Sequence, residues 1–326
     1  MSDYLLKVDH VSKEYEGTAR LFQKASPTVR AVSDVSFEIR KGETFGVVGE
    51  SGCGKSTLGK CIVRLHPITK GDIWYNDNGT PKDITKLSSE ESFRMRRKVQ
   101  MVFQDPYASL NPSHNILEAF DEPMRVHGLG SKEERREIIA EKLREVNLQP
   151  DYMYRFPGEF SGGQRQRICV AKALALQPEL IVCDEPVSAL DVSIQAQLLN
   201  LMRELQAEYG LTYMFIAHDL SVVQYMSDRI AVMYLGKVVE ILDGETIHTE
   251  CRHPYTEALL SAVPIPVYGK RTDRIVLQGD VPSPINPPSG CKFHPRCSKC
   301  MGICKEVEPE LKEIGPNHQV ACHLYD

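Results

Sequence analysis

Residues 49–61 have the sequence GESGCGKSTLGKC. Three glycines fall within the first six residues, and a run of helix-forming residues follows Lys55. The pattern G-x-x-x-x-G-K-[ST] is typical of a phosphate-binding loop, in which backbone N–H groups surround a phosphate and the next helix points its N-terminus at the same anion. The preceding run TFGVVG (44–49) is short and apolar, so we expect the loop to connect a buried strand to a helix.

Each residue type in this loop has a role in binding a nucleoside triphosphate. The glycines allow close approach of the backbone to phosphate. Lys55 can reach the β- and γ-phosphates, and the Ser56 hydroxyl can ligate Mg²⁺. The alternative is a Gly-rich turn followed by a surface lysine, but a chance match to the motif has a probability of only roughly 1%. The predicted nucleotide-contacting residues are Gly49, Ser51, Gly52, Cys53, Gly54, Lys55, Ser56 and Thr57.

A second stretch, LIVCDEP (180–186), ends an apolar run with two carboxylates. Asp184 is predicted to contact the nucleotide site through the hydration shell of Mg²⁺, and Glu185 to orient and deprotonate the attacking water. Taken alone, a strand that ends in two solvated acids would be an ordinary feature. The phosphate loop earlier in the chain favours the catalytic interpretation.

A third stretch, FSGGQRQR (160–167), is another Gly-rich helix start suited to an anion. One nucleotide site hardly needs two such starts, whereas a dimer in which each chain supplies this element to its partner's nucleotide uses both. The string resembles the signature of the ABC-transporter ATPase family, which usually has Leu where Phe160 stands. The predicted nucleotide-contacting residues in it are Ser161, Gly162, Gly163 and Gln164.

The resemblance to this family covers most of residues 1–260 and implies further site residues. Gln104 in MVFQDP matches the glutamine that contacts Mg²⁺ and water, and His218 in FIAHD matches the histidine that contacts the γ-phosphate. Tyr15 matches the aromatic residue under the adenine. Ser188, Ala189, Leu190 and Asp191 match the loop that communicates across the dimer. Taken singly, each has a structural explanation; their order relative to the phosphate loop favours the functional one.

Strand-like runs alternate with helical patterns along residues 1–260, which predicts an α/β fold with a mostly parallel sheet. Two helices are expected at 114–128 and 131–148, and Ser131 followed by Glu134 is a capping box. The resemblance implies a more specific fold, the P-loop NTPase fold of ABC ATPases. That fold has a RecA-like core, an antiparallel β-subdomain and a helical subdomain.

The composition changes after about residue 262, where a Pro/Gly-rich stretch without clear periodicity begins. We therefore expect an ABC nucleotide-binding domain over 1–262, with its helical subdomain at about 105–175, and a small Cys-rich C-terminal extension over 263–326. Within the first domain, Gly210 is expected to end a long helix, and Gly236 to turn the chain between two short strands.

Charge and hydropathy limit the classes of partner. The 326 residues carry a formal net charge of -5, which gives no electrostatic argument for nucleic acid. No apolar run reaches the roughly 18 residues of a transmembrane helix. The N-terminus lacks the long apolar stretch and the cleavage site of a signal peptide. We expect a cytosolic protein that can still dock on a membrane protein.

Within the family, the chain resembles the ATPase subunits of oligopeptide and dipeptide importers, a branch that includes nickel importers. The stretches that carry this resemblance are GESGCGKSTLGK, MVFQDPYASLNP, ALDVSIQAQLLNLM, FIAHDLSVV, HPYTEALLSAVP and GCKFHPRC. It implies an ATPase peripheral to the cytoplasmic face of the membrane, with two permease subunits and a related but different ATPase as partners. An extracytoplasmic solute-binding protein would be an indirect partner.

Two rival classes explain less of the sequence. A non-transport ABC ATPase that acts on nucleic acid or ribosomes usually has two cassettes in one chain or a long coiled-coil insert, and this chain shows one of each motif. A plain electron-transfer protein would leave the ATPase motifs unexplained. ATP hydrolysis coupled to peptide uptake is the preferred interpretation.

Five of the ten cysteines, Cys291, Cys297, Cys300, Cys304 and Cys322, lie in the last 36 residues. In a reducing compartment such crowding favours metal over disulfides. Four thiolates can hold a [4Fe–4S] cluster or Zn²⁺, and the spacing matches neither standard pattern, so both stay open beside reduced structural cysteines. Peptide-importer ATPases carry a similar pattern that in some members binds [4Fe–4S]. This implies Cys291, Cys297, Cys304 and Cys322 as ligands, with Cys300 as a substitute.

Overall fold

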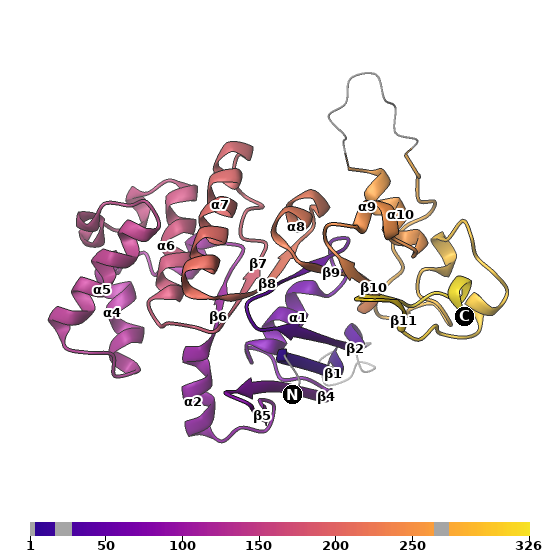
Figure 1. Ribbon diagram of the computed structural model, residues 1–326, viewed down its shortest axis with the longest axis horizontal. Coiled ribbons are helices and arrows are strands. Elements are labelled where there is room, and N and C mark those ends of the chain that lie inside the picture. Colours follow the sequence, from indigo (N-terminus) through magenta and orange to yellow (C-terminus); the bar gives the residue numbers. More distant parts are fainter. Residues whose placement is uncertain (1–3, 17–27, 264–273) are drawn as a thin grey trace, which may run out of the picture. The chain divides into compact units, whose positions relative to one another are not determined.

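The computed structural model describes residues 4–16, 28–263 and 274–326 (Figure 1). The chain divides into two compact units. The first unit consists of Met1–Arg40, Thr44–Thr85 and Ile216–Asp326, and the second of Lys41–Glu43 and Lys86–Phe215. The first unit therefore combines the N-terminal and C-terminal parts of the chain.

The first unit contains an antiparallel sheet of four strands. Its order is β2-β1-β4-β5, and its strands are β1 (Tyr4–Tyr15), β2 (Val29–Arg40), β4 (Lys70–Asp77) and β5 (Thr80–Asp83). Buried residues such as Val8 and Val35 alternate with more exposed ones along the two long strands, as expected for strands with one face in a core. This sheet corresponds to the antiparallel β-subdomain expected from the sequence.

A second group of strands in the first unit carries the phosphate loop. Its order is β11-β12-β10-β9-β3, with β3 (Thr44–Val48), β9 (Arg229–Tyr234), β10 (Lys237–Asp243), β11 (Lys312–Gly315) and β12 (His318–Val320). The pair β3–β9 is parallel, and every residue of β3 is buried. Leu235 and Gly236 both have positive φ, which forms the tight β9–β10 turn predicted at Gly236.

The helices of the first unit are short. They are α1 (Lys55–Ile62), α8 (Leu220–Met226), α9 (Ile247–Glu250) and α10 (Pro254–Ser261). The region of α8 packs closely on β3: a Cβ added to Gly46 would lie 2.4 Å from both Ser227 Oγ and Val223 Cγ1. This close approach explains why a residue without a side chain stands in the middle of a buried strand.

The second unit contains most of the helices. They are α2 (Ser89–Lys98), α3 (Pro106–Ser109), α4 (Ile116–Val126), α5 (Lys132–Glu145), α6 (Gly162–Leu174) and α7 (Val192–Tyr209), with 3-10 turns η1 (Pro150–Tyr154) and η2 (Pro157–Glu159). Strands β6 (Val99–Val102) and β7 (Leu180–Asp184) pair in parallel, and β8 (Thr212–Ala217) begins in this unit. Figure 1 shows α4, α5 and α6 gathered into one helical group.

Local interactions determine where two of these helices begin and end. Ser131 Oγ accepts a hydrogen bond from Glu134 N, and the Glu134 carboxylate accepts one from Ser131 N, so the predicted capping box at α5 is confirmed. Gly210 adopts a left-handed conformation with φ 62° and ends α7. Both features depend on residues a few positions apart, which is why the sequence predicts them.

The C-terminal residues are more ordered than their composition indicates. The stretch 312–320 forms a hairpin in which β12 pairs with β10, while short turns η3 (His294–Arg296), η4 (Ile303–Lys305) and η5 (His323–Tyr325) connect the rest. Strands of three or four residues are too short to show a period in sequence, so the sequence pattern does not predict them. The expected domain boundary after residue 262 adjoins residues 264–273, which lie outside the described residues, and it stays a prediction.

A fully buried carboxylate joins the C-terminal hairpin to the sheet. Glu240 on β10 accepts hydrogen bonds from the backbone N–H groups of Arg252, at 2.6 Å, and His253, at 3.1 Å. The Glu240 carboxylate also lies 2.9 Å from Nε2 of His318 on β12. A buried carboxylate is tolerated only when such partners satisfy it, so these contacts act together to hold β12 and the start of α10.

We predict that Glu240→Ala lowers the free energy of unfolding by about 3 kcal/mol, because it leaves the buried N–H of His253 and the part-buried N–H of Arg252 without an acceptor. Chemical denaturation followed by circular dichroism measures this change. The matched control is Glu245→Ala at an exposed position, which should change stability by no more than about 0.5 kcal/mol. Equal stability of the two variants would contradict the role of Glu240.

Candidate functional site

The phosphate loop of the first unit connects β3 to α1, as predicted. Gly54 directly precedes α1 and has φ 104°, a conformation that favours glycine. A Cβ at this position would lie 2.1 Å from the carbonyl oxygen of Ala31 on β2. At the other end of the loop, a Cβ on Gly49 would lie 2.1 Å from the carbonyl oxygen of Met233 on β9. The loop is therefore packed against both strands, and only glycine fits at these two positions.

The loop lysine is directed back at its own loop. Lys55 is buried, and its Nζ donates hydrogen bonds to the carbonyl oxygens of Gly49, at 2.8 Å, and Glu50, at 3.1 Å. Ser56 and Thr57 follow in the first turn of α1. This is an ammonium held inside a ring of backbone groups at a helix N-terminus, the arrangement that suits a phosphate anion.

Two other predicted residues also lie in the first unit. Tyr15 ends β1, where its ring meets His66 edge-on with centroids 5.8 Å apart and lies 4.8 Å from Lys13 Nζ. His218 is exposed and follows β8 directly, before Asp219 caps α8. His218 therefore stands at the carboxyl end of β8, and the carboxyl ends of strands are the usual place for ligand contacts in α/β folds.

The second unit brings two predicted catalytic residues together. Gln104 Nε2 donates a hydrogen bond of 3.0 Å to Glu185 Oε2, although 81 residues separate them. Asp184 is buried at the end of β7. Glu185 follows it with φ 47°, an uncommon backbone conformation for a non-glycine residue and a form of strain that is often found at active sites.

The Gly-rich stretch of the second unit is the start of α6. Ser161 caps this helix: its Oγ accepts a hydrogen bond from Gln164 N, and the Gln164 side chain accepts one from Ser161 N. A Cβ on Gly163 would lie 2.5 Å from Ile194 Cγ2, so α6 and α7 approach closely at this point. A cavity of about 680 Å³ is lined by all four residues predicted here together with Ala189, Leu190 and Asp191.

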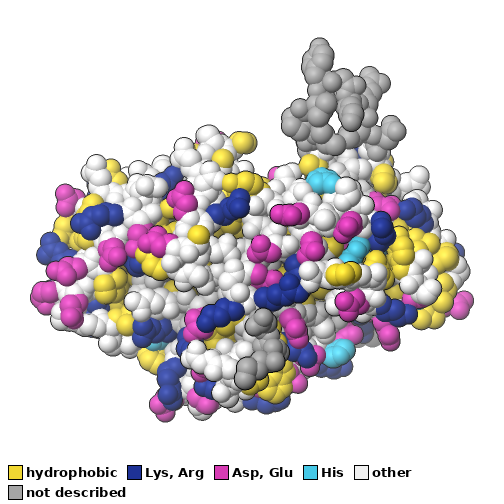
Figure 2. Space-filling model, in the orientation of Figure 1, with side chains coloured by type: hydrophobic (Ala, Val, Ile, Leu, Met, Phe, Trp, Pro, Cys, Tyr) yellow, Lys and Arg dark blue, Asp and Glu magenta, His cyan; other side chains and the backbone are white. Residues whose placement is uncertain are grey.

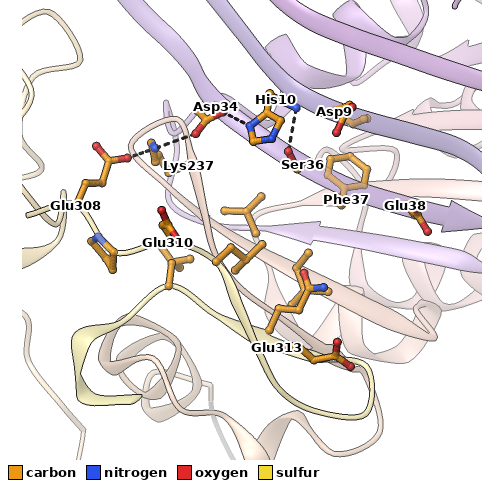
Figure 3. A pocket seen from close by; sticks show the side chains of 18 of the residues that line it. Asp9, His10, Asp34, Ser36, Phe37, Glu38, Lys237, Glu308, Glu310 and Glu313 are labelled. Carbon is orange, nitrogen blue, oxygen red and sulfur yellow. Dashed lines mark hydrogen bonds and ion pairs between the residues drawn. The ribbon is translucent and has the colours of Figure 1, made fainter. Parts of the chain in front are cut away.

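Another cavity, of about 990 Å³, lies in the first unit away from the phosphate loop (Figure 3). It is lined by β1, β2, β9, β10 and the C-terminal residues, and the sequence analysis did not predict it. Its charged groups are largely paired with one another: Asp34 contacts His10 at 2.7 Å and Lys237 at 4.0 Å, and Lys237 also pairs with Glu308. These pairs connect the C-terminal residues to the β-subdomain.

Comparison with known proteins identifies the family. The family model described as ABC transporter matches residues 32–188, and the model described as oligopeptide/dipeptide transporter, C-terminal region, matches 239–304. The putative oligopeptide transport ATP-binding protein YkfD of Bacillus subtilis is 55% identical over 302 residues, which cover 91% of this chain and 90% of that protein. The chain belongs to the family of ABC transporter ATP-binding proteins.

Other members of the ABC family match over similar lengths. The oligopeptide transport ATP-binding protein AppF of Bacillus subtilis is 52% identical over 324 residues, which cover 98% of this chain and 97% of that protein. Among solved structures, a dimeric ATP-binding cassette in a post-hydrolysis state, bound to ADP and Pi, has a TM-score of 0.62 and 30% identity. It covers 73% of this chain and 98% of its own. These matches support the ABC ATPase fold expected from the sequence.

The cysteines in this ABC protein's C-terminal region do not support the metal site expected there. Within the described residues, no group of three or more His, Cys, Asp or Glu side chains is arranged to hold a metal ion. The described residues therefore give no support to the iron–sulfur cluster or to the zinc alternative.

Sequence analysis missed two residues that contact the phosphate loop of this ABC protein. Tyr255 Oη accepts a hydrogen bond from Glu50 N at 2.9 Å, and the Arg296 guanidinium pairs with the Glu50 carboxylate. Arg296 lies inside the quoted stretch GCKFHPRC, but a contact across 246 residues has no signal in a single sequence. Only its presence between two cysteines of that motif could have drawn attention to it.

We predict that Gly54→Ala destabilises the protein by about 2 kcal/mol or more, because it combines a left-handed backbone with a backbone clash that cannot relax. Thermal or chemical unfolding measures the loss. Gly302→Ala is the control, since Gly302 has φ -55° and a Cβ there meets nothing within 4 Å. A Gly54→Ala protein as stable as this control would show that the loop is not constrained as described.

Proposed function

We propose that the chain is the ATP-binding and ATP-hydrolysing subunit of an ABC importer that takes up di- or oligopeptides through a membrane permease. The observation that carries this proposal is the match over almost the whole chain with oligopeptide transport ATP-binding proteins, which includes their C-terminal region. The structure supports it with a phosphate loop whose lysine and glycines have the geometry described above.

In this proposal the first unit binds the nucleotide. The loop from Gly49 to Thr57 surrounds the phosphates with backbone N–H groups, and Lys55 exchanges its carbonyl partners for phosphate oxygens. Tyr15 stacks on the adenine, a contact that contributes about 1–3 kcal/mol by analogy with base–aromatic stacking. His218 contacts the γ-phosphate. A buried ammonium that already sits within the loop needs only a small rearrangement to reach the anion.

Mg²⁺ accompanies ATP in this class of enzyme, and the predicted residues offer suitable ligands. Ser56, Gln104 and Asp184 supply hydroxyl, amide and carboxylate oxygens, the hard donors that Mg²⁺ prefers. The Asp184 carboxylate is only 4% exposed at the end of β7, and a buried carboxylate is readily explained by a cation or its hydration shell. The ion would neutralise charge on the phosphates during transfer.

The second unit supplies the groups that activate water. Glu185 acts as the general base, and the hydrogen bond from Gln104 holds its carboxylate in one orientation. Because Gln104 is hydrogen-bonded to Glu185, a movement of Gln104 within the unit would also shift the Glu185 carboxylate.

A second ATPase subunit completes the site in this proposal. Ser161, Gly162, Gly163 and Gln164 contact the nucleotide bound to the partner, and residues 188–191 lie across the interface. The cavity that both segments line supports one shared surface for these contacts. The partner is proposed to be a related but different chain, and closure of the two subunits on ATP drives the permease.

The remaining partners follow from the transport role. Among the helices of the described residues, none has both the length and the apolar character to span a membrane. The similarity to oligopeptide transport ATP-binding proteins supports two permease subunits as the path of the peptide, to which this chain binds at the cytoplasmic face. The extracytoplasmic solute-binding protein reaches it only through them.

No observation favours the nucleic-acid alternative. On the face shown in Figure 2, acidic and basic side chains of the described residues are interspersed. The formal net charge is -5. A protein that binds nucleic acid usually presents a concentrated basic surface.

The iron–sulfur cluster, or zinc in its place, stays a prediction that rests on the sequence resemblance alone. Iron, sulfide and zinc analysis of anaerobically purified protein decides it. Iron and sulfide at about four per chain would establish the cluster and require the four thiols to rearrange, whereas their absence would agree with the thiols as placed.

We predict that Glu185→Gln reduces the ATPase rate by about 10²–10⁴-fold, because it removes the general base. It should leave ATP affinity within about twofold of wild type, since the phosphate loop is untouched. Release of phosphate and equilibrium binding of a fluorescent ATP analogue measure the two effects. Glu204→Gln is the control, because it removes the same charge at an exposed position in the same unit.

The transport role is tested with the chain assembled with its permease subunits in membrane vesicles. Wild type should drive ATP-dependent uptake of a labelled peptide presented with the solute-binding protein, and Glu185→Gln should not. Normal turnover in the Glu185→Gln protein would remove Glu185 from its role. ATPase activity without uptake of any peptide would reject peptides as the cargo.

A further inference from the structure

An ion pair links the C-terminal residues to the phosphate loop. Arg296 Nη1 lies 2.7 Å from Glu50 Oε2, and Nη2 lies 3.1 Å from Oε1, so the guanidinium grips the carboxylate with two parallel hydrogen bonds. The Arg296 side chain is 8% exposed and that of Glu50 is 26% exposed. A bidentate pair with this much burial is geometrically defined, unlike most surface ion pairs.

Glu50 occupies the second position of the loop motif, where its backbone helps to form the phosphate-binding ring. Its carbonyl oxygen accepts hydrogen bonds from Lys55 Nζ, at 3.1 Å, and from Cys53 N, at 3.3 Å. Its N–H donates to Tyr255 Oη at 2.9 Å. Movement of Glu50 would therefore disturb both a hydrogen-bond partner of Lys55 and the turn that follows. The Arg296 contact holds the carboxylate of Glu50, while Tyr255 holds its backbone N–H.

A cluster of buried aromatic side chains positions Arg296 beside the phosphate loop. Phe293, Tyr234 and Tyr255 are buried and pack with ring centroids 4.8–5.3 Å apart. Arg296 N donates to Phe293 O at 3.0 Å, and the guanidinium carbon lies 5.9 Å from the Tyr234 ring. Aromatic clusters of this kind have few alternative packings. The guanidinium is therefore positioned by the protein core and not by a mobile surface segment.

The pair also has an electrostatic consequence for ATP binding. A carboxylate in the second position of a phosphate loop is a negative charge beside the intended site of a polyanion, and in a partly buried setting such repulsion is weakly screened. Arg296 balances that charge at contact distance. Without it, Glu50 would oppose the phosphates and would also be free to draw Lys55 toward its carboxylate.

We propose that Arg296 is a positioning residue for ATP binding, which neutralises Glu50 and holds the phosphate loop in the shape that accepts a triphosphate. The inference rests on the proposed ATP-binding function and adds to it a contribution from the C-terminal region. In this inference the C-terminal region helps to hold the nucleotide site in shape, independently of any other ligand that the region binds.

Other contacts hold the C-terminal residues to the first unit when the Arg296–Glu50 pair is removed. The hairpin stays paired to β10 and bonded to Glu240, and Lys237 holds Glu308 on the wall of the other cavity (Figure 3). Loss of Arg296 therefore removes the contact with the loop without detaching the hairpin. This allows the pair to be tested in folded, full-length protein.

The test measures the dissociation constant of a fluorescent N-methylanthraniloyl ATP with full-length protein at fixed ionic strength. Arg296→Gln should raise the constant about tenfold, because it leaves the Glu50 charge unbalanced. Adding Glu50→Gln to that variant should bring the constant back to within about threefold of wild type, since no charge remains to balance. Arg296→Lys, which keeps the charge and loses the bidentate grip, should fall between wild type and Arg296→Gln.

Two controls separate the possible failures. Lys299→Gln breaks the ion pair between Lys299 and Glu257 elsewhere in the C-terminal region and should bind the analogue like wild type. Lys55→Ala should abolish binding. Unchanged affinity in Arg296→Gln, or a double variant as weak as Arg296→Gln, would overturn the inference while the proposed function stands. A wild-type protein that binds no better than Lys55→Ala would overturn the proposed function and the inference with it.

Discussion

The conformation of the phosphate loop at Gly54 is the constraint on which the rest of the first unit depends. The residue has φ 104° and lies so close to the Ala31 carbonyl that no side chain fits. The loop therefore cannot move independently of β2, and α1 must begin at Lys55. Because Lys55 is turned toward carbonyls of the same loop, the ammonium and the helix N-terminus converge on one small region. The proposed ATP-binding site depends on that convergence.

The C-terminal region contributes to the same constraint from the opposite end of the chain. Tyr255 holds the backbone of Glu50, and Arg296 holds its carboxylate. Glu240 in turn keeps β12 and the start of α10 in place, so the support extends from the loop to the last strand. The described residues 274–326 therefore belong to the same compact unit as the phosphate loop.

The second unit assembles the complementary chemistry by itself. Gln104 and Glu185 meet through a hydrogen bond within this unit, and the start of α6 shares a cavity with residues 189–191. Each of these arrangements is complete within the second unit and depends on contacts between residues far apart in the sequence.

By itself the sequence determined the features that depend on residues close together in the chain: the loop motif at 49–56, the capping box at Ser131 and the helix end at Gly210. It also determined the family, because its motifs occur in a characteristic order. Only the tertiary structure decided that Gln104 contacts Glu185 and that Arg296 reaches the loop, and it left the expected cysteine site unsupported. Contacts across many residues depend on packing of the whole chain, and spacing along a sequence does not determine how close side chains come in space.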